Sequence, residues 1–134
     1  MSRVEIRVTI SSDQDIVVAR QKGRSLALEL GFSSGDATLI ATAISELARN
    51  IVSYAGSGQI ALKDLQGSTR VGITVTASDT GPGIPNVSQA LRDGFSTSGS
   101  LGLGLPGVRR LMDEFEIDSK PGQGTRVVVK KWRP

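Results

Sequence analysis

The sequence contains no cysteine and no histidine. Without cysteine the chain can form neither a disulfide nor a thiolate metal site, which is ordinary for a cytosolic protein. Without histidine it lacks a Ser-His-Asp triad, the commonest zinc ligand and any residue that could carry a phosphohistidine. These absences exclude a disulfide scaffold, a triad hydrolase and a phosphohistidine relay within this chain.

Aromatic residues make up only 4% of the chain and apolar residues 38%, which predicts an aliphatic core. No apolar run reaches the length needed to span a bilayer, and the N-terminus lacks the apolar core of a signal peptide. The net charge of +3 does not demand an acidic partner. We therefore expect a single domain over 1–134, located in the cytoplasm, with no nucleic-acid or membrane partner.

Hydrophobic periodicity divides the chain into strands and helices. Strands are predicted at 3–10, 59–65, 69–79, 116–120 and 125–132, and helices at 13–30, 33–55 and from 106 onward. Residues 80–104 carry few regular signals, which is typical of a functional lid or binding loop. The order β-α-α-β-β-loop-α-β-β predicts an α+β, two-layer α/β sandwich, with a mixed, mainly antiparallel sheet covered on one face by helices.

Glu46 and Asn50 are four residues apart in the second predicted helix, so they share one face. A carboxylate there can polarise an attacking hydroxyl, and an amide oxygen can ligate Mg²⁺. The simpler interpretation is a solvated polar face on which Glu46 pairs with Arg49 at i, i+3. Taken alone, the motif favours that simpler interpretation.

Asp79 ends a predicted strand and has the same parity as the apolar residues of that strand. Its carboxylate should therefore point toward the helical layer, where it needs a hydrogen-bond donor. The exocyclic amine of adenine is such a donor, and Gly81 and Gly83 permit a turn whose backbone approaches a planar base closely. A plain Asp-Thr-Gly-Pro-Gly turn explains the same residue types.

Four glycines lie between Gly99 and Gly107, and the segment ends at a predicted helix start. Free backbone N–H groups and the helix dipole favour an anion there, although a flexible loop with a glycine hinge is the alternative. The chain has no P-loop motif, and the lack of a preceding strand excludes a dinucleotide-binding fingerprint. Thr125 begins the last strand in phase with Val127 and Val129, so its hydroxyl is expected on the Asp79 side, although a β-branched residue often simply begins a strand.

Together these three segments, with Gly122 to Thr125, resemble the GHKL ATPases, which include DNA gyrase, Hsp90, MutL and the catalytic domains of histidine kinases. Over nearly the whole chain the sequence resembles more closely the RsbT-type serine/threonine switch kinases of the bacterial stressosome, relatives of the anti-sigma-factor kinases. The segments that carry this resemblance are 15–20, 43–51, 93–99 and 111–115.

The resemblance implies the GHKL (Bergerat) fold, ATP and Mg²⁺ as cofactors, and a role for each motif residue. It makes Glu46 the general base and Asn50 the magnesium ligand at the nucleotide. Asp79 would read the adenine amine, with Gly81, Gly83 and Ile84 as its neighbours at the base, and Thr125 would support Asp79 through a hydroxyl or water. The phosphate-binding lid would contain Gly102, Leu103, Gly104 and Leu105. Leu101 and Pro106 depart from the wider superfamily but fit the RsbT-type pattern.

The implied function is that of an Mg-ATP-dependent serine/threonine protein kinase. It would phosphorylate the STAS-domain antagonist and scaffold proteins of a stressosome and, once released, activate a PP2C-type phosphatase. One alternative is an ATP-gated binding module that sequesters and releases partners, as an anti-sigma factor does. Glu46 distinguishes the two, because binding alone needs no base. A bare ATPase resembling a gyrase or MutL head is expected less, since the sequence shows no transducer domain.

Overall fold

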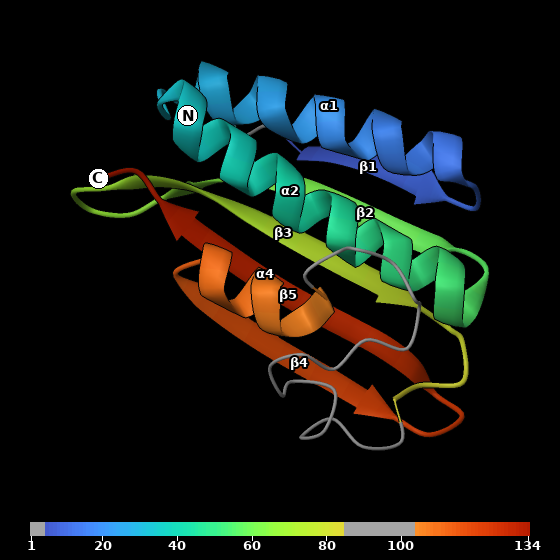
Figure 1. The fold of residues 1–134 in the computed structure, drawn as a ribbon. Helices are drawn as coiled ribbons and strands as arrows, with labels where there is room; N and C mark the ends of the chain where they lie inside the picture. The colour runs from blue at the N-terminus through green and yellow to red at the C-terminus, as the bar shows by residue number, and fades with distance from the viewer. Residues whose placement is uncertain (1–4, 85–103) are drawn as a thin grey trace.

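The computed structural model describes residues 5–84 and 104–134, which form a sheet with helices packed on one face (Figure 1). The elements, in chain order, are β1 (Glu5–Ile10), α1 (Asp13–Glu29), α2 (Ser34–Asn50), η1 (Ile51–Ala55), β2 (Gly58–Gln66), β3 (Val71–Asp79), α4 (Gly104–Leu111), β4 (Glu114–Lys120) and β5 (Gly124–Trp132). This order confirms the predicted α+β sandwich, and the element boundaries differ from the predicted ones by a few residues.

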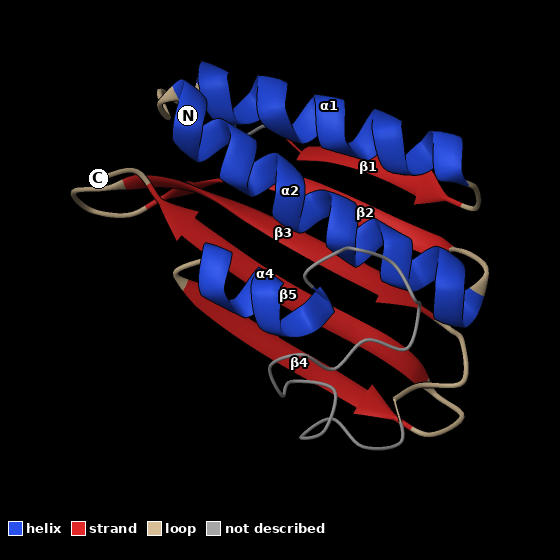
Figure 2. Cartoon of the chain, in the orientation of Figure 1, coloured by secondary structure: helices blue, strands red, loops and turns tan. Residues whose placement is uncertain are grey.

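The five strands follow the order β1-β2-β3-β5-β4. The sequence predicted a mixed, mainly antiparallel sheet, and every pairing among the described strands is antiparallel. Figure 2 shows α1, α2 and α4 on the same side of the sheet. The register places Asp79 of β3 opposite Thr125 of β5, and Thr125 opposite Ser119 of β4. Three polar residues therefore form one row across neighbouring strands at the end of the sheet.

The core is aliphatic, as the composition predicts. Alternate residues of the strands face the helices, so that Val75 and its register partner Val129 are both fully buried. Helix α2 contributes Ile40, Ile44 and Leu47, which recur at helical spacing and are buried against the sheet. The burial of these side chains fixes the face that α2 turns to the sheet, and hence the direction of its polar residues.

Polar side chains form hydrogen bonds at the start of each of the two long helices, α1 and α2. Ser12 is the N-cap of α1, and Asp15 accepts hydrogen bonds from Ser11 N and from both serine hydroxyls. The bond from the Ser11 backbone, followed by that from its hydroxyl, lowers the pKa of Asp15 below its ordinary value of 3.8. Ser33 Oγ accepts from Asp36 N at the start of α2. Both caps lie in the segments that the sequence marked as helix starts.

Helix α2 does not continue to its end as a regular α-helix. The sequence predicts one helix to residue 55, whereas the structure changes at Ile51 into the π-helical turn η1. Gly56 N–H donates to Ile51 O at 2.9 Å, a bond that spans five residues. The wider turn follows directly after Asn50 and brings Ala55 to the sheet end occupied by Asp79. Among the described helices, none is long and apolar enough to cross a bilayer.

Candidate active site

Glu46 is a buried carboxylate, with only 6% of the residue exposed. Its Oε1 lies 2.6 Å from Arg49 Nη1, and its Oε2 accepts a hydrogen bond from Gly104 N at 3.2 Å. The predicted i, i+3 pair with Arg49 is therefore confirmed, but the solvated polar face is wrong for Glu46. A buried carboxylate is costly unless it is paired. Arg49 and the first residue of α4 together supply that compensation.

Asn50 is the last residue of α2 and is half-buried, one turn beyond Glu46. Within residues 5–84 and 104–134 there is no group of three or more acidic, histidine or cysteine side chains that could enclose a metal ion. Mg²⁺ bound with a nucleotide does not require one, because phosphates and water provide most of its ligands. A single amide oxygen at Asn50 fits that kind of site.

Asp79 stands at the beginning of a tight turn that is fastened at three points. Gly81 N donates to Asp79 Oδ1 at 2.9 Å, Gly122 N donates to Pro82 O at 2.7 Å, and Ile84 N donates to Ser119 Oγ at 2.7 Å. Asp79 Oδ2 receives no hydrogen bond from the described residues, so this oxygen can accept from a ligand. A carboxylate with one oxygen free fits the amine of an adenine base.

The turn also contacts the end of the helix that carries Glu46. A Cβ built on Gly81 would lie 2.6 Å from the Cβ of Ala55 in η1. Along the helix axis Ala55 is roughly 13 Å from Glu46, at about 1.5 Å per residue. Asp79 and Glu46 therefore mark the two ends of one elongated candidate site.

Thr125 is joined to a residue that the sequence reasoning missed. Its Oγ1 lies 2.7 Å from Ser119 Oγ, and Ser119 Oγ also lies 3.3 Å from Gly124 O. Ser119 has the same parity as the half-buried Ile117 of β4, so it faces the helical layer. That parity is readable in the sequence as a polar residue at an apolar position of an alternating strand, and this signal could have identified Ser119.

The glycine-rich segment is only partly described. Gly104 begins α4 and donates its N–H to Glu46, while the side chain of Leu105 is buried in the core. Leu105 can therefore offer only its backbone to a ligand. Gly102 and Leu103, and most of the predicted lid at 80–104, lie outside the described residues.

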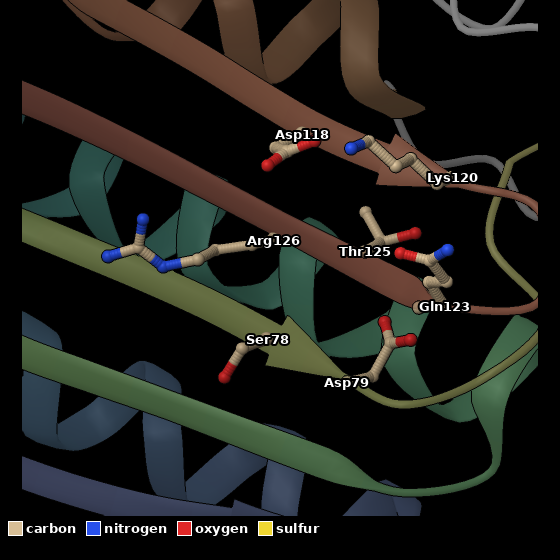
Figure 3. A pocket seen from close by; sticks show the side chains of 8 residues that line it. Ser78, Asp79, Asp118, Lys120, Gln123, Thr125 and Arg126 are labelled. Atoms are coloured by element: carbon tan, nitrogen blue, oxygen red, sulfur yellow. The ribbon is translucent and has the colours of Figure 1, made fainter.

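The same end of the sheet contains a cavity of about 260 Å³ on its other face. Asp79 and Thr125 line it, together with Ser78, Asp118 and Arg126, which form the neighbouring row and have the opposite parity. In Figure 3 the strands lie in front of the helices, so this view looks onto the face that the helices leave open. Glu46 and Asn50 are on the helix side. The cavity therefore reaches Asp79 and Thr125, at one end of the elongated candidate site, whereas Glu46 and Asn50 do not line it.

Replacing Gly83 by alanine should disrupt the turn. Gly83 has φ +80°, and an added Cβ would meet the backbone carbonyl of Lys120. The left-handed conformation alone costs about 1–2 kcal/mol for a residue with a Cβ, and the contact with the backbone adds to this cost. We expect a lower thermal midpoint and a loss of ATP affinity of roughly tenfold or more.

Gly56→Ala is the matched control for this change. Gly56 has φ +84°, but no atom lies within 4 Å of the position of its Cβ. Thermal unfolding and calorimetric titration with ATP should show a loss of stability in Gly56→Ala, from its positive φ, with ATP affinity retained. If both variants lost ATP affinity equally, the turn at Gly83 would have no special part in binding.

Comparison with known proteins agrees with this geometry. A family model described as histidine kinase-, DNA gyrase B-, and HSP90-like ATPase matches residues 35–134. The serine/threonine-protein kinase RsbT of Bacillus subtilis (strain 168) is 54% identical over 125 residues, which is 93% of this chain and 94% of that protein. An anti-sigma F factor of Caldanaerobacter subterraneus subsp. tengcongensis is 29% identical over 127 residues, with 92% and 89% covered.

Solved structures share the fold at low sequence identity. The mycobacterial sensor histidine kinase MprB superposes with a TM-score of 0.56 at 16% identity, over 98% of this chain and 99% of that one. The catalytic domain of histidine kinase ThkA gives a TM-score of 0.53 at 18% identity, over 98% and 95%. These likenesses establish a common two-layer architecture.

Proposed function

We propose that this chain phosphorylates a STAS-domain protein of a stressosome. The chain belongs to the histidine kinase-, DNA gyrase B-, and HSP90-like ATPases and is an ATP-binding serine/threonine protein kinase. The observation that carries the proposal is the position of Glu46. This carboxylate is buried one turn from Asn50 and is bonded to the first residue of α4. A module that only bound ATP would not need a carboxylate there.

We propose that the two ends of the elongated site hold the two ends of the nucleotide. Asp79 reads the adenine amine with its free oxygen, and Gly81, Gly83, Ile84 and Thr125 form the surroundings of the base. Asn50 ligates Mg²⁺ near the phosphates, which also meet the backbone of Gly104 and Leu105, together with Gly102 and Leu103 outside the described residues. The roughly 13 Å between Ala55 and Glu46 supports this assignment, because it suits an extended nucleoside triphosphate.

In this proposal Glu46 is the general base. ATP and Mg²⁺, when bound, supply the phosphoryl group and neutralise its charge. Glu46 accepts the proton of the acceptor hydroxyl as the hydroxyl oxygen bonds to phosphorus and the bond to the leaving ADP breaks. Both Glu46 oxygens are engaged in the described structure, by Arg49 and by Gly104 N. The carboxylate has about four acceptor sites, so it can still accept from a substrate hydroxyl while it keeps both contacts.

The partners of the kinase are proposed from its relatives. The similarity to RsbT and to anti-sigma F factors supports regulatory signalling through protein partners. We propose that STAS-domain antagonist and scaffold proteins are the substrates, and that the released kinase activates a PP2C-type phosphatase in the cytoplasm. The whole chain would act as one kinase domain.

Incubation with labelled ATP, Mg²⁺ and the STAS proteins encoded beside this gene tests the proposal. We expect labelled phosphoserine or phosphothreonine on a STAS protein with the wild type and with Glu116→Gln, an exposed control on the open face of β4 outside the lining of the cavity. Stable ATP-dependent complexes without any transfer would contradict kinase activity and indicate the alternative, an ATP-gated binding module.

A further inference from the structure

Three polar side chains lie in one row at the end of the sheet. Asp79, Thr125 and Ser119 occupy register positions on β3, β5 and β4, and all have the parity of the buried residues in their strands. Other positions with this parity carry mainly apolar side chains that pack against the helices. Ser119 is the member of the row farthest from Asp79, and none of the roles proposed above uses it.

The Ser119 hydroxyl makes three short contacts but has only one hydrogen to donate. It accepts from Ile84 N at 2.7 Å, so its hydrogen goes either to Thr125 Oγ1 at 2.7 Å or to Gly124 O at 3.3 Å. Either hydroxyl can be the donor in the 2.7 Å contact between Ser119 and Thr125. When Ser119 donates, the Thr125 oxygen accepts, and the hydrogen of Thr125 is left to point away from β4, toward Asp79.

We propose that Ser119 is a positioning residue that determines base specificity through Thr125. Its donated hydrogen fixes Thr125 as a donor on the side where Asp79 presents a free acceptor oxygen. Such a donor–acceptor pair matches adenine, which presents an amine next to a ring nitrogen that accepts. Guanine and hypoxanthine present a carbonyl next to an N–H, which is the reverse pattern. The inference rests on the proposed reading of adenine by Asp79.

Ser119 has a second effect on the same site. By accepting from Ile84 N it ties the turn after Asp79 to β4. A side chain that merely held this turn would support every nucleotide equally. A side chain that also orients Thr125 would give an additional contribution to the affinity for bases with an acceptor at the ring nitrogen. This difference separates positioning of the base from simple support of the fold.

Calorimetric titration with three nucleotides tests the proposal. ATP carries both groups, 1-deaza-ATP lacks the ring nitrogen, and purine riboside triphosphate lacks the amine. We expect the wild type to prefer ATP over 1-deaza-ATP on the order of tenfold. Ser119→Ala should lose most of that preference, while it keeps the preference for ATP over purine riboside triphosphate. Ser119→Thr, which retains the hydroxyl, should restore the wild-type ratio.

Two further variants make the result decisive. Thr76→Ala removes a hydroxyl from the open face of β3, outside the lining of the cavity, and should change neither ratio. In a Thr125→Val background, Ser119→Ala should have no additional effect on the ATP to 1-deaza-ATP ratio, because Ser119 acts through Thr125. A thermal melt of each variant without nucleotide shows whether it folds. If Ser119→Ala does not fold, the same titrations are made on Ser119→Cys, and their result decides the role of Ser119.

The outcomes separate this inference from the function on which it rests. An equal loss of affinity for all three nucleotides, or an unchanged ATP to 1-deaza-ATP ratio, would overturn the role of Ser119. A wild-type protein that bound purine riboside triphosphate as well as ATP would instead overturn the reading of adenine by Asp79.

Discussion

Asp79→Asn should weaken ATP binding by 10²- to 10³-fold and leave the protein folded. The asparagine oxygen can still accept from Gly81 N, so the turn keeps the bond that Asp79 Oδ1 now makes. The amide nitrogen then occupies the place of the free carboxylate oxygen. It faces the adenine amine, and because both groups are hydrogen-bond donors, no bond forms between them. The lost charge-assisted bond and the unpaired donor together amount to about 3–4 kcal/mol.

The same change should alter which base is bound. Hypoxanthine has a carbonyl where adenine has its amine, and the asparagine amide can donate to that carbonyl. Calorimetry with ATP and with inosine triphosphate should therefore show the wild-type preference for ATP reduced or reversed in Asp79→Asn. Asp13→Asn, at the exposed start of α1 and outside the lining of the cavity, is the matched control and should bind both nucleotides as the wild type does. Near-normal ATP binding by a folded Asp79→Asn protein would remove Asp79 from the site.

Much of this end of the sheet could be predicted from parity. Period-two alternation in β3 assigns Asp79 to the helix-facing side, and the same argument applied to β5 assigns Thr125 to that side. The register then brings these two residues directly opposite each other. Alternation works here because one face of the sheet is buried and the other is open, so a shift of one residue would expose the whole apolar set.

Other features depend on contacts between distant segments and could not be predicted. The motif of Glu46 and Asn50 was compatible with an exposed helix face, because local spacing does not reveal what packs above a helix. The burial of Glu46 follows from α4, which begins 58 residues later in the chain at Gly104. The π turn after Asn50 was also missed, since residues 51–55 have no distinctive composition, and in the structure this turn packs against β2 and β3.

Glu46→Gln should reduce phosphoryl transfer on the order of 10²-fold or more. The substitution keeps the shape of the side chain but removes its ability to accept a proton. It also has a structural consequence that can be stated in advance. Glu46 now accepts from two donors, Arg49 and Gly104 N. The amide can accept from only one of them, so its nitrogen faces the other.

The design of the experiment must therefore separate the loss of a base from the loss of an anchor for α4. Single-turnover transfer to a STAS protein measures the first, and ATP affinity with the thermal midpoint measures the second. A general base predicts that transfer falls by orders of magnitude while ATP and partner affinities change little. If Glu46 serves instead as an anchor for α4, ATP affinity and the thermal midpoint should fall together with the rate of phosphoryl transfer. Glu29→Gln, at the exposed end of α1, is the matched control and should match the wild type in every measurement. Equal transfer by Glu46→Gln and wild type would show that Glu46 is not the base, and the burial of its carboxylate would then serve only to hold α4 against α2.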